Sequence, residues 1–266
     1  MELASRKEVA VYIDLENLRY SLLNLFGQEP DFGKLVEKAK QYGRPSVMRA
    51  YADFSEHPSA LRQQLHVAGI EAINVNVKRM RRPVQGRNVE RIKNAADMIL
   101  ALDATSEAMD ADANGKVKVF LLVTGDADYI RLVTQLKHRF GQKVVICGVP
   151  GSIGTDLVAA ADDSNPIEVE KQDPVDPEIV RKALFAMIQS GPAPLRFWSV
   201  NIIDQWAQDP RHRIPGTAKE KRDALHSLLR DGVLAKREID LATVGKKGTA
   251  AETYIVEAKA KELGYI

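Results

Sequence analysis

The sequence predicts a three-layer α/β domain with a central parallel sheet, followed by a smaller α+β domain. Over residues 1–170, short β-branched runs alternate with longer helical patterns, which is typical of a parallel sheet covered by helices on both faces. The runs VFLLV at 119–123 and VVIC at 144–147 are continuously apolar, as expected for strands that are buried on both faces. Beyond residue 170 the pattern changes to helices followed by a hairpin.

The elements of the first domain follow from these runs in order. Strands are expected over residues 9–14, 46–52, 70–77, 118–124 and 143–149, with a short sixth over 167–170. Helices are expected over residues 17–26, 31–43, 56–68, 89–111, 127–140 and 152–162.

A change of composition marks the domain boundary. The stretches DDSNP and KQDPVDPE bring acids and three prolines together, so we expect domains over 1–170 and 171–266. The second part shows helical patterns near 177–189, 200–208 and 217–230, and then two strand patterns around TVGKKGT. Three helices followed by a basic hairpin is the outline of a winged helix.

Bulk composition excludes several classes of protein. The formal net charge of +2 is nearly balanced, so charge alone does not indicate a nucleic-acid binder. A single cysteine, Cys147, excludes an internal disulfide and suits a reducing compartment. The chain shows neither the apolar region of a secretory signal nor an apolar run of the ~18 residues that a membrane span needs. A cytoplasmic protein without a membrane partner is expected.

Acidic residues follow two of the predicted strands. Asp14 ends the first strand, and Asp126 and Asp128 come directly after VFLLVTG. In an open α/β sheet the ligand crevice lies beyond the carboxyl ends of the strands, and like charges held there repel unless a cation neutralises them. Mg²⁺ or Mn²⁺ suits a set of carboxylate ligands. Helix capping by Asp126 and a favourable helix-dipole position for Asp128 are the structural alternatives.

The long helical pattern RIKNAADMILALDATSE supplies further acids. Its apolar face includes Ile99, and Asp97 lies about 200° around the helix from that residue. Asp103 lies about 40° from Ile99 and so borders the buried face. Either carboxylate can point into a crevice at the sheet edge, and Asp103 is therefore a further candidate metal ligand.

Three ordered segments, YIDLENL at 12–18, NAADMILALDA at 94–104 and LLVTGDADYIRLV at 121–133, resemble the signature motifs of the NYN domain in its LabA-like branch. This resemblance implies a PIN-like, Rossmann-like fold and a metal-dependent nuclease. It implies that the catalytic, metal-binding cluster consists of Asp14, Asp97, Asp126 and Asp128. It also places Asn17 and Thr124 beside the acids, as candidate substrate-binding residues. The second motif departs from the usual Lys-Gly-Val-Asp, because Asn94-Ala95-Ala96 precede Asp97 and the lysine stands one place earlier, at Lys93.

A basic segment, KRMRRPVQGRNVERIK, links the third strand to the Asp97 helix. Pro83 and Gly86 indicate a loop, and its position next to the acidic site predicts phosphate-backbone binding that is salt-dependent and has little base specificity. The candidate substrate-binding residues in it are Lys78, Arg79, Arg81, Arg82, Arg87 and Lys93. Further basic residues, at Arg211, Arg213, Lys219, Lys221, Arg222, Lys246 and Lys247, give the second domain a nucleic-acid-binding alternative to a role in homodimer or partner binding.

The stretch GVPGSIG at 148–154 invites a dinucleotide-binding interpretation. The required glycine pattern is incomplete, because Pro150 and Ile153 stand where glycines are needed. This loop is expected instead to border the same crevice as the acids.

The prediction is a Mg²⁺- or Mn²⁺-dependent endoribonuclease that acts on single-stranded RNA. RNA rather than DNA rests on the resemblance alone. The rival functions are a non-catalytic RNA-binding or regulatory protein and a metal-dependent phosphatase that acts on small molecules.

Overall fold

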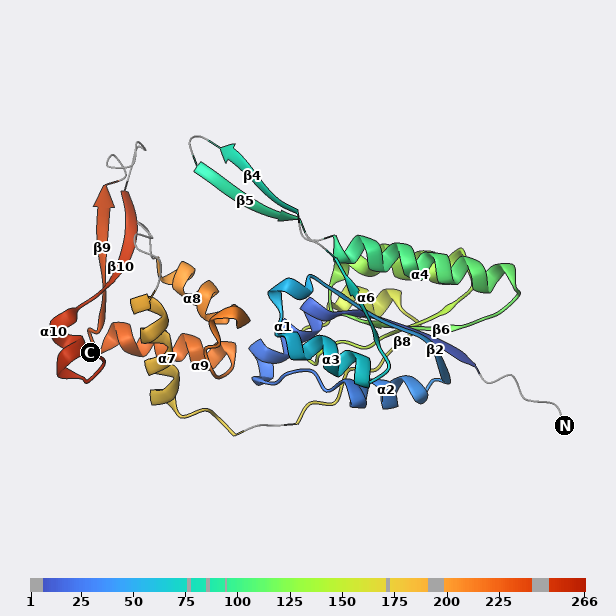
Figure 1. Cartoon of the computed structure of the whole chain (residues 1–266), viewed down its shortest axis with the longest axis horizontal. Coiled ribbons are helices and arrows are strands. Elements are labelled where there is room, and N and C mark those ends of the chain that lie inside the picture. Colours follow the sequence, from blue (N-terminus) through green and yellow to red (C-terminus); the bar gives the residue numbers. More distant parts are fainter. Residues whose placement is uncertain are drawn as a thin grey trace. The chain divides into compact units, whose positions relative to one another are not determined.

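The computed structural model describes residues 7–75, 78–84, 87–93, 95–170, 173–190, 199–240 and 249–266. The chain folds into two compact units, one of residues 1–21 with 29–170 and the other of residues 22–28 with 171–266 (Figure 1). No helix in the described ranges combines the length and apolar character needed to cross a membrane.

The first unit is built on a six-stranded sheet in which every neighbouring pair of strands is parallel. The strand order is β3-β2-β1-β6-β7-β8. The strands are β1 (Glu8–Asp14), β2 (Arg44–Ala52), β3 (Glu71–Asn74), β6 (Val119–Val123), β7 (Lys143–Ile146) and β8 (Asp163–Ser164). The predicted α/β class with a central parallel sheet is confirmed.

Helices flank this sheet, and Figure 1 shows α4 on one side of it and α2 on the other. The helical elements are α1 (Leu15–Phe26), α2 (Phe32–Lys40), η1 (Phe54–Glu56), α3 (Ser59–Val67), α4 (Ala96–Ala113), η2 (Ala127–Tyr129), α5 (Ile130–His138) and α6 (Thr155–Ala160). The five residues of β6 are all buried, as their unbroken apolar run predicts.

Aromatic rings from three neighbouring strands pack against each other in the cluster that α4, α5 and α6 cover. The ring of Tyr12 in β1 lies 6.3 Å from Tyr51 in β2 and 6.1 Å from Phe120 in β6, and both pairs are stacked. Leu100 of α4 and Leu136 of α5 are buried in the same cluster. This packing fixes the helix that carries Asp97 against the centre of the sheet.

The basic segment is a β-hairpin rather than the predicted loop. Strands β4 (Lys78–Val84) and β5 (Arg87–Lys93) pair antiparallel over seven residue pairs. The predicted helix start at residue 89 is wrong for the same reason, because the chain belongs to β5 as far as Lys93 and α4 begins only at Ala96. Pro83 does not prevent the pairing, since a two-stranded ribbon leaves the outer edge of each strand without a partner.

The predicted sixth strand at 167–170 is also wrong. Pairing with β7 begins at Asp163 and ends at Ser164. Single backbone hydrogen bonds continue beside β7, from Asn165 N to Ile146 O at 2.8 Å and from Ile167 N to Gly148 O at 3.0 Å. Pro166 lies between these two donors, and its missing N–H removes no bond to β7, because only alternate residues of a strand donate to the same neighbour.

The second unit contains three helices and an antiparallel hairpin, together with a last helix that the sequence did not indicate. The elements are α7 (Pro177–Ser190), α8 (Val200–Gln208), η3 (Pro210–His212), α9 (Ala218–Arg230), β9 (Leu234–Asp240), β10 (Thr249–Ile255) and α10 (Glu257–Glu262). A capping box of Thr217 and Glu220 begins α9. The winged-helix identity and the domain limits at residue 170 stay predictions, and Lys246 and Lys247 lie outside the described residues.

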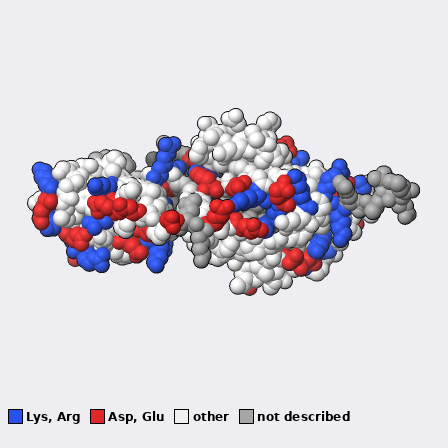
Figure 2. All heavy atoms as spheres, turned by 90° about the horizontal axis from the view of Figure 1, so that it is seen from below, with Lys and Arg blue, Asp and Glu red and all other residues white. Residues whose placement is uncertain are grey.

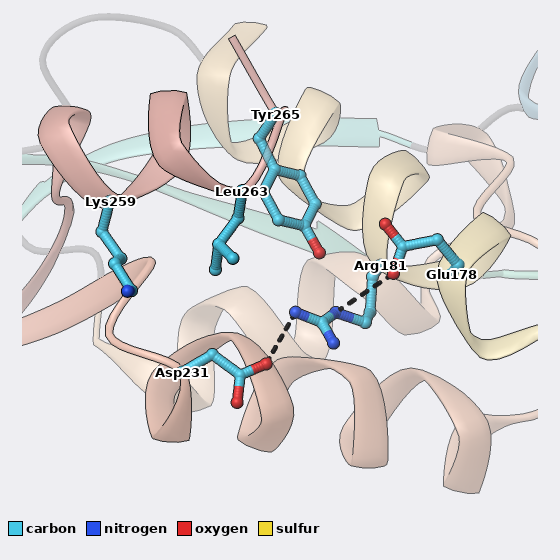
Figure 3. A pocket seen from close by; sticks show the side chains of 6 residues that line it. All are labelled: Glu178, Arg181, Asp231, Lys259, Leu263 and Tyr265. Carbon is cyan, nitrogen blue, oxygen red and sulfur yellow. Dashed lines mark hydrogen bonds and ion pairs between the residues drawn. The ribbon is translucent and has the colours of Figure 1, made fainter.

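A pocket of about 410 Å³ in this unit surrounds Arg181 of α7 (Figure 3). An Arg181 Nη2 atom lies 2.7 Å from Asp231 Oδ2, which joins α7 to the C-terminal end of α9. Figure 3 shows Tyr265 beside this guanidinium, and the ring centroid of Tyr265 lies 5.7 Å from the guanidinium carbon. The ion pair between Arg181 and Asp231 thus lines the pocket, and the side chain of Arg181 is one-fifth exposed.

We expect Arg181→Met to lower the free energy of unfolding of the second unit by about 1–3 kcal/mol, because Asp231 loses a charged hydrogen-bond partner in a half-buried place. Lys259→Met is the matched control, since it removes one positive charge from the same pocket but breaks only the exposed pair with Glu262. Urea unfolding followed by tryptophan fluorescence measures this, because Trp206 lies in α8 of the second unit and the sequence has no tryptophan before residue 198. Equal midpoints for the two variants would contradict a stabilising role of the pair.

Candidate active site

The order of the strands places the acids together. From β1 the chain builds outward through β2 and β3, returns to pair β6 with β1, and builds outward again through β7 and β8. The direction therefore reverses between β1 and β6, which is where open α/β sheets bind their ligands. Asp14 is the last residue of β1, and Asp126 follows the end of β6 by three residues.

Asp14 is a buried carboxylate, 5% exposed. Its Oδ1 accepts the N–H of Asn17 at 3.0 Å, and its Oδ2 lies 3.4 Å from both Thr124 Oγ1 and Tyr129 Oη. Burial raises the pKa of Asp14 from 3.8 to about 7, against the stabilising N–H of Asn17, and the charges of Asp97, Glu16 and Asp126 raise it further. A cation bound beside Asp14 would favour the charged form of this carboxylate.

Asp97 lies in the first turn of α4 and reaches the same place from the helix. Tyr129 Oη donates to Asp97 Oδ1 at 3.0 Å. Burial raises the pKa of Asp97, the hydrogen bond from Tyr129 opposes this, and the charges of Asp126 and Asp128 add to the rise. Asp14 and Asp97 thus both contact the hydroxyl of Tyr129, and the predicted four-aspartate cluster stays a prediction.

Tyr129 is the residue that sequence reasoning missed. Its hydroxyl stands between Asp14 and Asp97, and burial together with these two carboxylates raises the pKa of Tyr129, so that it remains a protonated donor. A phenol has a single hydrogen to donate, and the shorter contact to Asp97 is the better donor geometry. The sequence feature that could have identified Tyr129 is its position directly after the two aspartates in GDADY.

Asp126 and Asp128 also take part in the backbone turn that follows β6. Asp126 caps η2, because its Oδ1 accepts the N–H of Asp128 at 3.0 Å. The N–H of Asp126 itself donates to Thr124 Oγ1 at 3.2 Å. Asp128 is exposed in the first turn. The capping alternative is therefore correct for Asp126, and it leaves the second carboxylate oxygen of that residue outside the cap.

Asn17 and Thr124 hold the two strand ends together. Asn17 Oδ1 accepts the N–H of Gly125 at 2.9 Å, which ties the start of α1 to the turn after β6. Thr124 is 2% exposed, and its hydroxyl lies between Asp14 and the backbone of Asp126. Both were predicted as substrate-binding residues, and the structure gives each a positioning role.

The loop after β7 lies against this turn. Gly154 N donates to Gly125 O at 3.0 Å. A Cβ added at Gly125 would lie 2.4 Å from Ser152 O, a distance at which the backbone must move, so only glycine fits between the two segments. The stretch at 148–154 therefore borders the turn that carries the acids.

The structure places Asp103 apart from the other acids. Its carboxylate accepts the hydroxyl of Tyr51 at 2.8 Å and lies 3.5 Å from Arg49 Nη1. These partners satisfy it at the edge of the sheet, one and a half turns of α4 beyond Asp97. Of the two helix acids, Asp97 alone joins Asp14.

Whether a divalent cation fits can be judged from the donors. Within the described residues, no lysine or arginine forms an ion pair with Asp14, Asp97, Asp126 or Asp128. Carboxylate oxygens are the ligands that Mg²⁺ and Mn²⁺ prefer. In the same described ranges no three His, Cys, Asp or Glu side chains form a ready-made ligand group. The carboxylate oxygens are thus ligands of the right chemical type for such an ion, but they do not converge on one position in this structure.

The family model of the NYN domain matches residues 8–168, more than half of the chain. The chain belongs to the NYN domain family. Among solved structures, the crystal structure of a protein of unknown function from Vibrio parahaemolyticus RIMD 2210633 is similar, with 25% sequence identity and a TM-score of 0.51. The similarity covers 63% of this chain and 97% of that one. No curated protein matches the chain.

The match begins with β1 and ends beyond β8, so the NYN domain contains the whole acidic site. NYN domains are nuclease-like, and nucleases of this PIN-like class typically use divalent metal ions. Residues 171–266 of the second unit lie outside the matched residues, whereas its residues 22–28 lie within them.

The basic residues predicted to bind nucleic acid in the second unit are partly engaged within it. Arg211 pairs with Asp209 at 2.6 Å, and Arg222 pairs with Asp204 at 3.1 Å. Lys221 is 4% exposed, and burial lowers its pKa. On the face in Figure 2, acidic and basic side chains are interspersed rather than gathered by sign. These pairs reduce the charge that this unit can offer to a polyanion.

We expect Asp14→Asn to stabilise the metal-free protein at pH 8, by at most about 4 kcal/mol. Because the pKa of Asp14 rises to about 7 on folding, the folded protein keeps a proton that the unfolded chain loses above 3.8. The stability of the parent therefore falls between these two pH values, and the advantage of the variant grows over the same interval. Urea unfolding in a chelator at pH 5 and pH 8 measures it.

Asp128→Asn is the control, since it removes the same charge from an exposed position nearby. Added Mn²⁺ should then raise the stability of the parent at pH 8 and leave that of Asp14→Asn nearly unchanged. A lower stability of Asp14→Asn at pH 8 without metal would show that burial of the charge is not unfavourable.

Proposed function

We propose that this NYN domain is a Mg²⁺- or Mn²⁺-dependent ribonuclease that cleaves single-stranded RNA internally. The observation that carries the proposal is the meeting of Asp14 and Asp97 at the hydroxyl of Tyr129, with Asp126 and Asp128 close enough to raise the pKa of Asp97. Four carboxylates at the switch point of the sheet are suited to bind divalent cations and little else.

In this proposal each residue has a definite part. Asp14, Asp97, Asp126 and Asp128 provide the oxygens that would hold the metal. Tyr129 orients the carboxylate of Asp97, and Asn17 with Thr124 keeps the ends of β1 and β6 in register. When bound, Mg²⁺ or Mn²⁺ would supply a nucleophilic water at neutral pH and stabilise negative charge on the phosphate.

RNA is proposed as substrate because NYN domains suggest RNA binding. The basic residues of β4 and β5 are the proposed substrate-binding residues. The three motifs favour the LabA-like branch, and the three helices with the β9–β10 hairpin favour a winged-helix-like module in the second unit. Because Arg211 and Arg222 are paired internally, partner or homodimer binding suits that module at least as well as RNA binding does.

We expect Asp97→Asn and Asp126→Asn each to lower the rate of RNA cleavage at least about a hundredfold, since each removes a negative charge that the transition state needs for its metal. The assay uses labelled single-stranded RNA with Mn²⁺, with Mg²⁺, or with a chelator. Asp112→Asn is the matched control, because it makes the same change at an exposed position of the same helix. Cleavage by Asp126→Asn at the parental rate would refute the assignment.

The same experiment separates the rival functions. RNA that is bound but never cut, at any metal concentration, would indicate an RNA-binding or regulatory protein. Turnover of small phosphate esters that survives the double change Arg81→Glu and Arg82→Glu would indicate a phosphatase.

A further inference from the structure

Helix α4 has a second apolar face, which is turned away from the sheet. Met98, Leu102 and Met109 are 56%, 63% and 52% exposed. The other side of the helix, with Leu100 and Ala104, is buried in the core cluster over the sheet. A helix that is apolar on every side is normally covered on every side, so the exposed face of α4 is suited to a partner.

The three exposed side chains form one stripe along the helix, here called the α4 stripe. At ~100° per residue, Met98 and Met109 both lie within about 40° of Leu102 around the helix axis, and the stripe is about 16 Å long. Thr105 lies between Leu102 and Met109, and its Oγ1 donates to Ala101 O at 2.7 Å, so its hydroxyl is satisfied within the helix. Exposed apolar side chains that are gathered in this way indicate an interaction site, whereas scattered ones do not.

Acidic residues border the α4 stripe on both sides. Asp110 lies about 80° from Leu102 in one direction around the helix and Asp112 about 80° in the other, and both are exposed. The whole of α4 contains five acidic residues and no lysine or arginine. The face is therefore apolar along its centre and negatively charged along its edges.

The two exposed acids lie at the unfavourable end of the helix. Asp110 and Asp112 belong to the last turn of α4, where the helix dipole is negative, and this turn contains no basic residue. Glu107 differs from them, because its carboxylate pairs with Lys118 at 2.6 Å. A cation supplied from outside the helix would offset the repulsion between the dipole and the two exposed carboxylates.

Charge decides which partner fits this face. A two-fold contact between two copies of the chain would place α4 against α4 and bring the acids of both copies together. An anionic membrane would repel the same acids, and helices that lie on membranes carry Lys and Arg beside their apolar face. A helix with an apolar stripe and basic residues beside it matches both the centre and the edges of the face.

We propose that the α4 stripe binds a basic amphipathic helix of another protein. The apolar side chains of the partner pack on Met98, Leu102 and Met109, and its basic residues pair with Asp110 and Asp112. Methionine suits such a surface, because its unbranched side chain adapts to the shape of what it contacts. The inference stands on α4 alone and does not depend on the proposed nuclease activity.

Two designed peptides serve as probes, each as long as α4 at 18 residues. One repeats leucine at alternating spacings of ~3 and ~4 residues with lysines on either side of that stripe, and the other has glutamates in place of the lysines. Binding to the full-length protein is followed by fluorescence anisotropy of a labelled peptide in chelator. We expect the lysine peptide to bind at least about tenfold more tightly than the glutamate peptide, by an advantage that shrinks as salt is added.

A double variant of the protein, Leu102→Gln with Met109→Gln, tests the stripe itself. Glutamine has nearly the helix propensity of leucine and methionine, so α4 should stay helical. Val67→Gln with Ile179→Gln is the matched control, because it replaces two apolar side chains that are 81% and 55% exposed elsewhere. We expect the stripe variant to weaken binding of the lysine peptide at least about tenfold and the control to weaken it less than about twofold.

A third variant separates loss of the apolar surface from damage to the helix. Leu102→Met with Met109→Leu keeps the surface apolar and should bind the lysine peptide as the parent does. Urea unfolding of all the variants checks that each is folded.

Several outcomes would overturn the inference. They are failure of the parent to bind the lysine peptide, equal binding of the two peptides, and equal weakening by the stripe variant and its control. A dimer of the parent that the stripe variant dissociates would assign the face to a second copy instead. Binding to vesicles of anionic phospholipid that the stripe variant abolishes would assign it to a membrane. None of these measurements involves RNA cleavage, so their failure leaves the proposed nuclease function as it stands.

Discussion

The pairing of β1 with β6 is the constraint on which the site depends. These strands are more than a hundred residues apart in the chain, yet their residues lie side by side from Val9 with Val119 to Ile13 with Val123. Because the pairing is parallel, both strands end at the same edge, and Asp14 and Asp126 arrive there together. Stacked rings of Tyr12, Tyr51 and Phe120 and the packing of α4 over them bring Asp97 to the same edge. A change of register by one residue would turn Asp14 to the other face of the sheet.

Of the four aspartates, Asp14 is the one whose carboxylate is buried from water. Asp14 is nearly inaccessible, and its pKa is raised mainly by burial and then by neighbouring carboxylates. Among the described residues its partners are neutral groups: the N–H of Asn17, the hydroxyl of Thr124 and the phenol of Tyr129. Such neutral donors orient a carboxylate without cancelling its charge. A buried carboxylate of this kind destabilises the folded protein while no cation is bound, and a bound cation would remove that cost.

The acidic and the basic residues singled out above lie in different elements of the structure. In the NYN domain Asp14 and Asp126 lie at the ends of β1 and β6, whereas the basic residues that follow β3 belong to the β4–β5 ribbon. In the second unit three arginines form ion pairs with aspartates: Arg211 with Asp209, Arg222 with Asp204 and Arg181 with Asp231. In the sequence, three residues separate the basic segment that ends at Lys93 from Asp97.

The sequence by itself determined the α/β class, the parallel sheet and the acids at the strand ends, because apolar periodicity and the residues that end a strand are local properties of the chain. Helix periodicity alone identified both Asp97 and Asp103, and the family resemblance favoured Asp97. Only the tertiary structure shows what each contacts, since Tyr51 and Arg49 reach Asp103 from β2 while Tyr129 reaches Asp97 from η2. Local signals misjudged the segment at 78–93, because pairing between β4 and β5 outweighed the proline and glycine that suggested a loop. Which residues meet across a sheet depends on strand order and register, and these are set by packing over the whole domain rather than by any one segment.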